Sequence, residues 1–205
     1  RHKLNDLYRH TGFSRAKISV YLKNLMELEL VEKVFSFDTE GKANSQKGIY
    51  RISNHFVHFY FRFLYPKRSA LALMSADEFY EKNIQFSFKN FAALYFNEIC
   101  KQRIEKWNQE EKLPIAIDRI GEWVGKSGNI DVVAQDENGK TLAACCNWEK
   151  SVMQYGDYEK LLSSMGKAKL KADTIYLFSI QRFDEKLSLE AKMKKNLKLI
   201  SLEDM

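Results

Sequence analysis

The chain has 205 residues, of which 45% are hydrophobic and 29% charged, and its formal net charge is +6. This size and apolar fraction suit one large or two modest domains, whereas 2 Pro and 9 Gly exclude a collagen-like or low-complexity chain. No apolar run reaches the roughly 18–20 residues that a membrane-spanning helix needs, and no signal-peptide pattern opens the sequence. The three cysteines are too few and odd in number for a disulfide framework. We therefore expect a cytoplasmic protein without membrane partners.

The charge is unevenly distributed along the chain. Residues 1–68 hold 13 Lys/Arg against 6 Asp/Glu, whereas residues 69–205 hold the other 20 against 21. A basic segment joined to a near-neutral remainder is common in proteins that carry a nucleic-acid-reading module on a larger body. Lysines that merely solvate a small surface would give the same count, so charge alone leaves both interpretations open.

The basic third predicts a helix-turn-helix. Residues 4–9 read as a short helix, Gly12 lies in the turn that follows, and Ser14 stands at the N-cap of a second helix. The apolar face of this second helix, at helical spacing, comprises Ile18, Leu22, Leu25 and Leu28. Two short strands follow at residues 31–37 and 47–52. Helices followed by such a hairpin resemble a winged helix-turn-helix over about residues 1–53.

This resemblance implies binding to double-stranded DNA. The N-terminal part of the second helix enters the major groove in such domains, and the wing contacts phosphates. The residues that we expect to contact DNA are Ser14, Arg15, Lys17, Ser19 and Lys23 on the helix and Lys42 and Lys47 on the wing. Winged helices also serve as protein–protein modules, so a structural or partner-binding role remains the alternative.

A winged helix normally has a further helix before this pair. The sequence begins at Arg1 without an initiator Met. We therefore expect these residues to come from a longer protein, and we expect the helices within residues 4–30 to carry an apolar face that lacks its usual partner.

Residues 54–76 are expected to form a helical linker. The aromatic density of residues 54–65 suits either a base-stacking surface or, as we favour, a buried helix that joins two domains. His55 and His58 share a helical face, but no Cys or carboxylate stands at ligand spacing beside them. No metal site is therefore predicted.

Residues 77–205 predict an α/β sandwich around a mixed sheet, in a chain that is α+β overall. Ser75 and Glu78 form a capping box that opens a helix continuing, with interruptions, to Trp107. The later elements, in chain order, are strands at 118–124, 129–134 and 140–148, a helix at 157–170, a strand at 174–180, a helix at 186–196 and a strand at 197–200.

An acid on the leading helix and Gly-x-Ile-Asp at the second strand resemble the PD-(D/E)XK nuclease-like fold. The whole chain resembles the C-terminal portion of archaeal-type P-loop ATPases, in which an ATPase domain precedes a winged helix and a nuclease-like domain of unknown function. The stretches that carry the resemblance are 14–33, 47–51, 61–66, 98–100, 119–123, 129–134 and 146–148. It implies a DNA-binding or regulatory region that serves an upstream, ATP-binding domain of the same chain. No Walker A loop occurs within the 205 residues.

Nuclease chemistry in this fold needs carboxylates that hold Mg²⁺ and a lysine that activates water. By the resemblance, Glu98 matches the helix acid and Asp131 the metal-binding acid. The family motif Glu-Cys-Lys-Trp aligns with residues 145–148, so Cys145 replaces the second acid and Asn147 replaces the lysine. We therefore expect a domain that has lost catalysis, with no cofactor of its own.

Three alternatives remain open. A migrated Mg²⁺-dependent nuclease site would use Glu98, Asp131 and Glu149 with Lys150 beside it, because Glu149 continues the strand alternation of residues 145 and 147. A cysteine-based activity at residues 145–146 lacks a nearby His. A non-enzymatic assembly module, compatible with a homo-oligomer, would use the winged helix against a protein.

Overall fold

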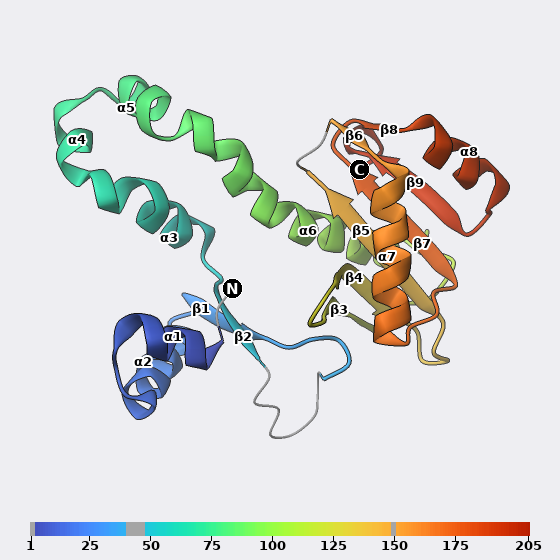
Figure 1. Ribbon diagram of the computed structural model, residues 1–205, viewed down its shortest axis with the longest axis horizontal. Coiled ribbons are helices and arrows are strands. Elements are labelled where there is room, and N and C mark those ends of the chain that lie inside the picture. Colours follow the sequence, from blue (N-terminus) through green and yellow to red (C-terminus); the bar gives the residue numbers. More distant parts are fainter. Residues whose placement is uncertain (1–2, 40–47, 149–150) are drawn as a thin grey trace. The chain divides into compact units, whose positions relative to one another are not determined.

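The computed structural model describes residues 3–39, 48–148 and 151–205 (Figure 1). The chain divides into two compact units, residues 1–88 and residues 89–205. Each unit contains both helices and strands, so the chain is a mixed α+β protein. Within the described ranges, every helix is too short or too polar to span a lipid bilayer.

The first unit begins with two helices and a hairpin. These are α1 (Leu4–Thr11), α2 (Arg15–Glu27), β1 (Val31–Val34) and β2 (Ile49–Ile52), and the two strands pair antiparallel. Gly12 ends α1 at φ +68°, a conformation that costs glycine little. The Ser14 Oγ accepts a hydrogen bond from the Lys17 backbone N–H at 3.3 Å and so caps α2. The predicted helices and hairpin are confirmed, although β1 ends at Val34 rather than at residue 37.

A series of short helices completes the first unit. In chain order they are α3 (His55–Phe59), a π-helical turn (Tyr60–Leu64), a 3₁₀ turn (Tyr65–Lys67), α4 (Arg68–Leu73) and α5 (Ala76–Asn83). Ser75 caps α5 by accepting from the Glu78 N–H at 3.3 Å, whereas the Glu78 carboxylate pairs with Lys82 Nζ at 2.7 Å. The favoured interpretation of residues 54–65 as a buried helix is wrong. Phe63 is buried, but several other rings of this segment are exposed.

The second unit is built on a five-stranded mixed sheet. The long helix α6 (Gln85–Gln109) leads into it, and the strand order is β3-β4-β5-β7-β9. The meander of β3 (Arg119–Val124), β4 (Asn129–Gln135) and β5 (Thr141–Asn147) is antiparallel. β7 (Thr174–Ser179) pairs parallel with β5, and β9 (Leu197–Ser201) pairs parallel with β7.

Helices provide the two parallel crossovers of this sheet. The first crossover contains β6 (Val152–Met153) and α7 (Tyr155–Ala168), and the second contains β8 (Arg182–Phe183) and α8 (Glu185–Met193). β6 and β8 pair parallel as a separate small sheet, and a 3₁₀ turn (Leu202–Asp204) ends the chain. The predicted mixed sheet between helices is therefore confirmed, with element ends shifted by a few residues.

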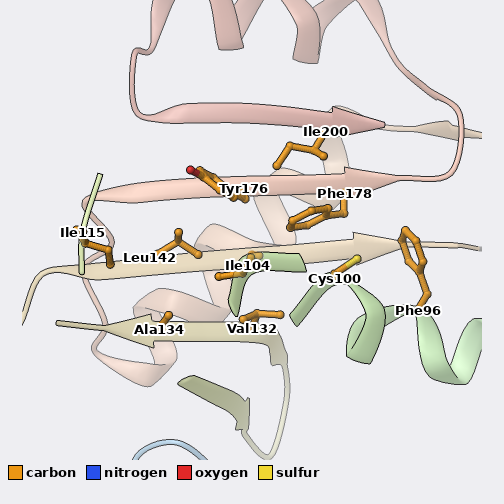
Figure 2. Close-up of a cluster of buried hydrophobic side chains, with 11 residues drawn as sticks. Phe96, Cys100, Ile104, Ile115, Val132, Ala134, Leu142, Tyr176, Phe178 and Ile200 are labelled. Atoms are coloured by element: carbon orange, nitrogen blue, oxygen red, sulfur yellow. The ribbon is translucent and has the colours of Figure 1, made fainter. Parts of the chain in front are cut away.

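The core of the second unit lies between α6 and one face of the sheet (Figure 2). Phe96, Cys100 and Ile104 recur every four residues along α6 and are almost fully buried. They pack against alternate residues of four strands, β4, β5, β7 and β9, among them Val132, Ala134, Leu142, Phe178 and Ile200. Because side chains alternate across a strand, the buried Val133, Ala143 and Leu177 point to the opposite face, where α7 contacts β4 and β5. Both faces of the sheet are thus covered, which fixes its register.

Candidate functional site

A cleft in the second unit is organised around Asp131. The Asp131 side chain leaves β4 near its start, and its Oδ1 accepts a hydrogen bond from Asn97 Nδ2 of α6 at 2.9 Å. Its Oδ2 accepts another from the Cys146 backbone N–H of β5 at 2.9 Å. One carboxylate therefore ties the long helix and two strands together. Such bonds to a charged acceptor are stronger than neutral ones.

The cleft has a volume of about 640 Å³. Its lining includes Asn97, Asp131, Cys145, Asn147, Lys160 and Lys167. The alternation along β5 places residues 145 and 147 on the same strand face, as the sequence predicts. Three of the residues that the sequence resemblance assigns to a nuclease-like site, at positions 131, 145 and 147, thus line the same cleft.

The helix acid is placed differently. Glu98 is half-buried on α6 but does not line the cleft, whereas its neighbour Asn97 both lines it and bonds to Asp131. Adjacent helical residues project about 100° apart, so only one of the two can face the strand. The sequence prediction did not include Asn97, because nuclease chemistry in this fold requires an acid on the leading helix and Glu98 is the acid there. The available signal was the spacing of Ala93 and Asn97, two small or polar residues one helical turn apart on the cleft side.

The remaining nuclease alternative depends on Glu149 and Lys150, which lie outside the described residues. Among residues 3–39, 48–148 and 151–205, no group of three His, Cys, Asp or Glu side chains is arranged to hold a metal ion.

The cysteine pair occupies two different environments. Both cysteines contribute to the lining of the cleft, and Cys146 also packs against the core cluster that contains Cys100. Burial raises the pKa of the Cys146 thiol well above its ordinary value, and the neighbouring Cys100 and Asp131 act in the same direction. The thiol of Cys146 is therefore neutral near pH 7, which does not favour nucleophilic chemistry there.

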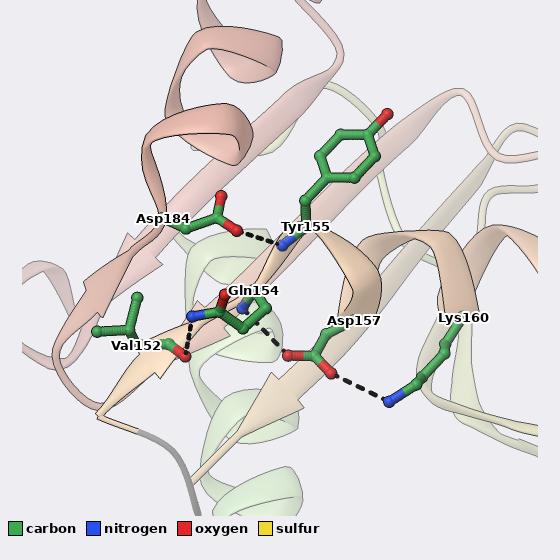
Figure 3. A network of polar contacts seen from close by, with 6 residues as sticks. All are labelled: Val152, Gln154, Tyr155, Asp157, Lys160 and Asp184. Carbon is green, nitrogen blue, oxygen red and sulfur yellow. Dashed lines mark hydrogen bonds and ion pairs between the residues drawn. The ribbon is translucent and has the colours of Figure 1, made fainter.

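The start of α7 supplies polar groups on the other side of the cleft (Figure 3). The Asp157 Oδ2 accepts from the Gln154 N–H at 3.1 Å, and its Oδ1 lies 3.5 Å from Lys160 Nζ. The Tyr155 N–H donates to Asp184 Oδ2 at 2.7 Å, which joins the start of α7 to that of α8. Further along α7, Lys167 Nζ donates to the Ser127 carbonyl at 2.7 Å. The two acids of the cleft, Asp131 and Asp157, both accept hydrogen bonds, and Lys160 lies near Asp157.

The helix α2 presents the other candidate surface. Ile18 and Leu22 are buried, whereas Arg15, Lys17, Ser19 and Lys23 are exposed. Each cation has a neighbour. The Arg15 guanidinium lies 5.9 Å from the Tyr8 ring centre, Lys17 Nζ lies 4.1 Å from the Phe13 ring centre, and Lys23 pairs with Glu27 at 3.7 Å. The two predicted wing contacts, Lys42 and Lys47, lie outside the described residues.

Apolar side chains are exposed in the same region. Tyr8, Phe13, Val20, Tyr21 and Leu28 all remain accessible to solvent. Of the apolar face predicted for the second helix, Ile18 and Leu22 are buried and Leu28 is exposed, so the expected lack of a partner for this face stays a prediction.

Comparisons with known proteins reveal relatives without a known function. The chain is 27% identical over 203 residues to an uncharacterized protein of Methanocaldococcus jannaschii, and this alignment covers 89% of the chain and 45% of that protein. The chain thus spans less than half the length of this relative. No solved structure matches the chain significantly. Residues 60–161 match the DUF234 family, which is described as archaeal and bacterial proteins of unknown function.

Proposed function

We propose that the chain is the DNA-binding and regulatory region of a larger ATPase, formed by a winged helix-turn-helix and a PD-(D/E)XK nuclease-like domain that has lost catalysis. The observation that supports DNA binding is the set of exposed basic residues on α2, opposite its buried residues. Ile18 and Leu22 of α2 are buried, whereas its polar residues Arg15, Lys17, Ser19 and Lys23 are exposed to solvent. The length of the Methanocaldococcus jannaschii relative, more than twice the aligned part, is compatible with a further domain in the parent protein.

The physical role of α2 follows from its charge and its cap. The Ser14 cap stabilises the first turn of α2, where Arg15 and Lys17 lie. Cations there reach phosphates or guanine edges when the N-terminal part of such a helix enters the major groove. The neighbouring rings of Tyr8 and Phe13 restrict the two cations and lower the entropy that they would lose on binding.

Fluorescence anisotropy with a labelled 20-base-pair duplex tests this binding as a function of salt. We expect affinity to fall steeply with salt, and each substitution, Arg15→Ala or Lys17→Ala, to reduce the salt slope by about 1. Lys82→Ala is the matched control, because Lys82 is an exposed lysine of the same unit outside α2. The proposal fails if the duplex shows no salt-sensitive affinity, or if the control variant loses as much affinity as the α2 variants.

Loss of catalysis is supported by the surroundings of Asp131. Both of its oxygens accept hydrogen bonds, from Asn97 and from the backbone of Cys146, and the adjacent positions carry a thiol and an amide. A thiol is a poor ligand for Mg²⁺, and an amide supplies no positive charge to the attacking water.

A plasmid-nicking assay with Mg²⁺ and with Mn²⁺ tests this part. We expect the protein to nick no faster than a buffer blank. Nicking that depends on the metal and disappears in Asp131→Ala would instead establish an active nuclease.

A second function, a protein-assembly module, is favoured by the exposed apolar side chains of the first unit. Tyr21 and Leu28 are two of these. Large exposed apolar patches mark interaction sites in soluble proteins. Light scattering after size-exclusion chromatography tests self-assembly. A dimer that Tyr21→Ser and Leu28→Ser convert to a monomer, together with no duplex affinity, would favour the assembly module.

A further inference from the structure

A continuous row of aromatic rings lies on the outside of residues 55–65. We name it the aromatic ladder and define it as Phe56, Tyr60, Phe61 and Tyr65. The ring centres of Phe56 and Tyr60 are 6.5 Å apart, those of Tyr60 and Phe61 are 5.3 Å apart, and those of Phe61 and Tyr65 are 5.3 Å apart. Contacts of this length are within the range in which aromatic rings attract one another.

The π-helical turn creates this alignment. The Tyr65 N–H bonds to the Tyr60 carbonyl five residues earlier, so Tyr65 lies over Tyr60 with ring centres 6.1 Å apart. A regular α-helix would place residue 65 on a different side from residue 60. Pro66 follows, and its missing N–H ends the regular hydrogen-bond series at this point. π-turns inside helices occur frequently at functional sites.

The ladder does not belong to the core of the unit. Phe59 and Phe63 contact each other at 5.2 Å, and Phe63 is buried, so these rings anchor the segment. By contrast, Phe56 is 70% exposed, Phe61 53% and Tyr65 46%. Leaving much of three large rings in water forgoes the favourable free energy of burying their apolar surface, which is not expected of a purely structural helix.

The segment that carries the ladder contains basic residues and no acidic ones. Residues 54–76 contain Arg62, Lys67 and Arg68 and no Asp or Glu. The Arg68 guanidinium lies 4.6 Å from the Tyr65 ring centre, and Arg62 is exposed. Lys67 Nζ donates to the Asn83 side-chain oxygen at 2.8 Å and holds the linker to α5. Arg68 thus lies against the ladder, and Arg62 is an exposed cation of the same segment.

We propose that the aromatic ladder binds single-stranded nucleic acid, with unpaired bases stacked on Phe61 and Tyr65 and phosphates bound by Arg62 and Arg68. Stacking on exposed rings within a cationic surface is the usual chemistry of such sites and requires no base sequence. The absence of acids from residues 54–76 favours a polyanion over an apolar protein surface, which would gain nothing from the arginines. The site is independent of duplex binding by α2.

Anisotropy of the full chain with a fluorescein-labelled oligo-dT of 15 nucleotides tests the ladder. Phe61→Leu and Tyr65→Leu keep the apolar area but remove the π-face, and we expect each to weaken binding about tenfold. Phe86→Leu is the matched control, because Phe86 is 97% exposed in the same unit and outside the ladder, and we expect no change. Arg62→Ala and Arg68→Ala should weaken binding and reduce its salt slope, which gives a second set of variants if a leucine variant is unstable.

The double variant with Arg15→Ala and Lys17→Ala separates this site from the proposed duplex surface. It should lose duplex affinity and retain oligo-dT affinity, whereas the ladder variants should show the reverse. Oligo-dT binding without duplex binding would contradict the role of α2 and leave the ladder supported. Wild-type protein that does not bind oligo-dT, or leucine variants that bind as well as wild type, would overturn the proposal.

Discussion

The Cys146 thiol packs at the edge of the core beneath α6, where burial raises its pKa well above the ordinary value. This raised pKa lowers the free energy of unfolding at alkaline pH. An unfolded chain ionises this thiol near pH 8.5, whereas the folded chain keeps it neutral until a higher pH. Its contribution to the free energy of unfolding is therefore complete below about pH 8.5 and is lost above that value.

Urea unfolding at pH 7.5 and pH 9.5, under reducing conditions, measures this effect. We expect the free energy of unfolding to fall above about pH 8.5 with a slope of up to about 1.4 kcal/mol per pH unit from this residue. Cys146→Ala should remove that part of the pH dependence. Cys145→Ala is the matched control and should retain it, and equal pH dependence in the wild type and Cys146→Ala would contradict the assignment.

Asn97 shows the limit of prediction at the residue scale. The sequence offered the adjacent pair Asn97-Glu98, and the chemistry expected of the fold directed attention to the acid. The hydrogen bond to Asp131 is made by the amide instead. Adjacent residues of α6 project in different directions, so the rotation of α6 about its own axis decides whether residue 97 or residue 98 faces β4. A shift of one residue in the packing of α6 against β4 would exchange the two positions. The local sequence carries little information on this rotation.

Among the elements, α2 depends on its cap. Ser14→Ala removes the side-chain acceptor of the Lys17 N–H, and we expect the free energy of unfolding to fall by about 1 kcal/mol. Thermal unfolding followed by circular dichroism measures the loss. Ser19→Ala, an exposed serine inside the same helix, should be neutral or slightly stabilising, because alanine favours helix interiors. Equal losses in both variants would show that the cap contributes little.

The loop before β4 and α7 approach each other closely at Gly128. A Cβ atom at residue 128 would lie 2.5 Å from the Ser164 Oγ, so we expect Gly128→Ala to destabilise the protein by about 1–3 kcal/mol. Adding Ser164→Ala should restore part of this loss, because it removes the contacting oxygen. Gly156→Ala is the control on the same helix, since its added Cβ would meet nothing within 4 Å. Denaturant midpoints of the four proteins form the test, and a loss that Ser164→Ala leaves unchanged would rule out this contact as its cause.

Across the whole molecule, the second unit contains its own core. α6 contributes Phe96, Cys100 and Ile104 to a cluster that reaches β4, β5, β7 and β9. We therefore expect residues 85–205 to fold alone and to unfold cooperatively in urea. Residues 110–205, which lack α6, should unfold without a cooperative transition and bind a hydrophobic dye. A cooperative transition in the shorter piece would show that α6 is dispensable for the core.

The kinds of elements and most of their order can be read from the amino-acid sequence alone. Periodicity identified α2, the β3–β5 meander and the strands of the mixed sheet, because apolar spacing reports which side of an element is buried. Turn residues such as Gly12 and the Ser14 cap fixed local ends, because their conformational preferences act over a few residues. The cluster of positions 131, 145 and 147 followed from strand alternation and from a family resemblance.

Which side chains meet across the fold is evident from the packing and not from the local sequence. It placed Asn97 rather than Glu98 against Asp131, and it exposed the rings of Phe56, Phe61 and Tyr65 where the sequence favoured a buried helix. Both outcomes depend on the direction in which a side chain projects from its helix. A π-turn or a small shift in packing changes that direction by a large fraction of a turn. Hydrophobicity shows that a ring gains by burial, but the partner that would cover it must come from elsewhere in the fold or from another molecule.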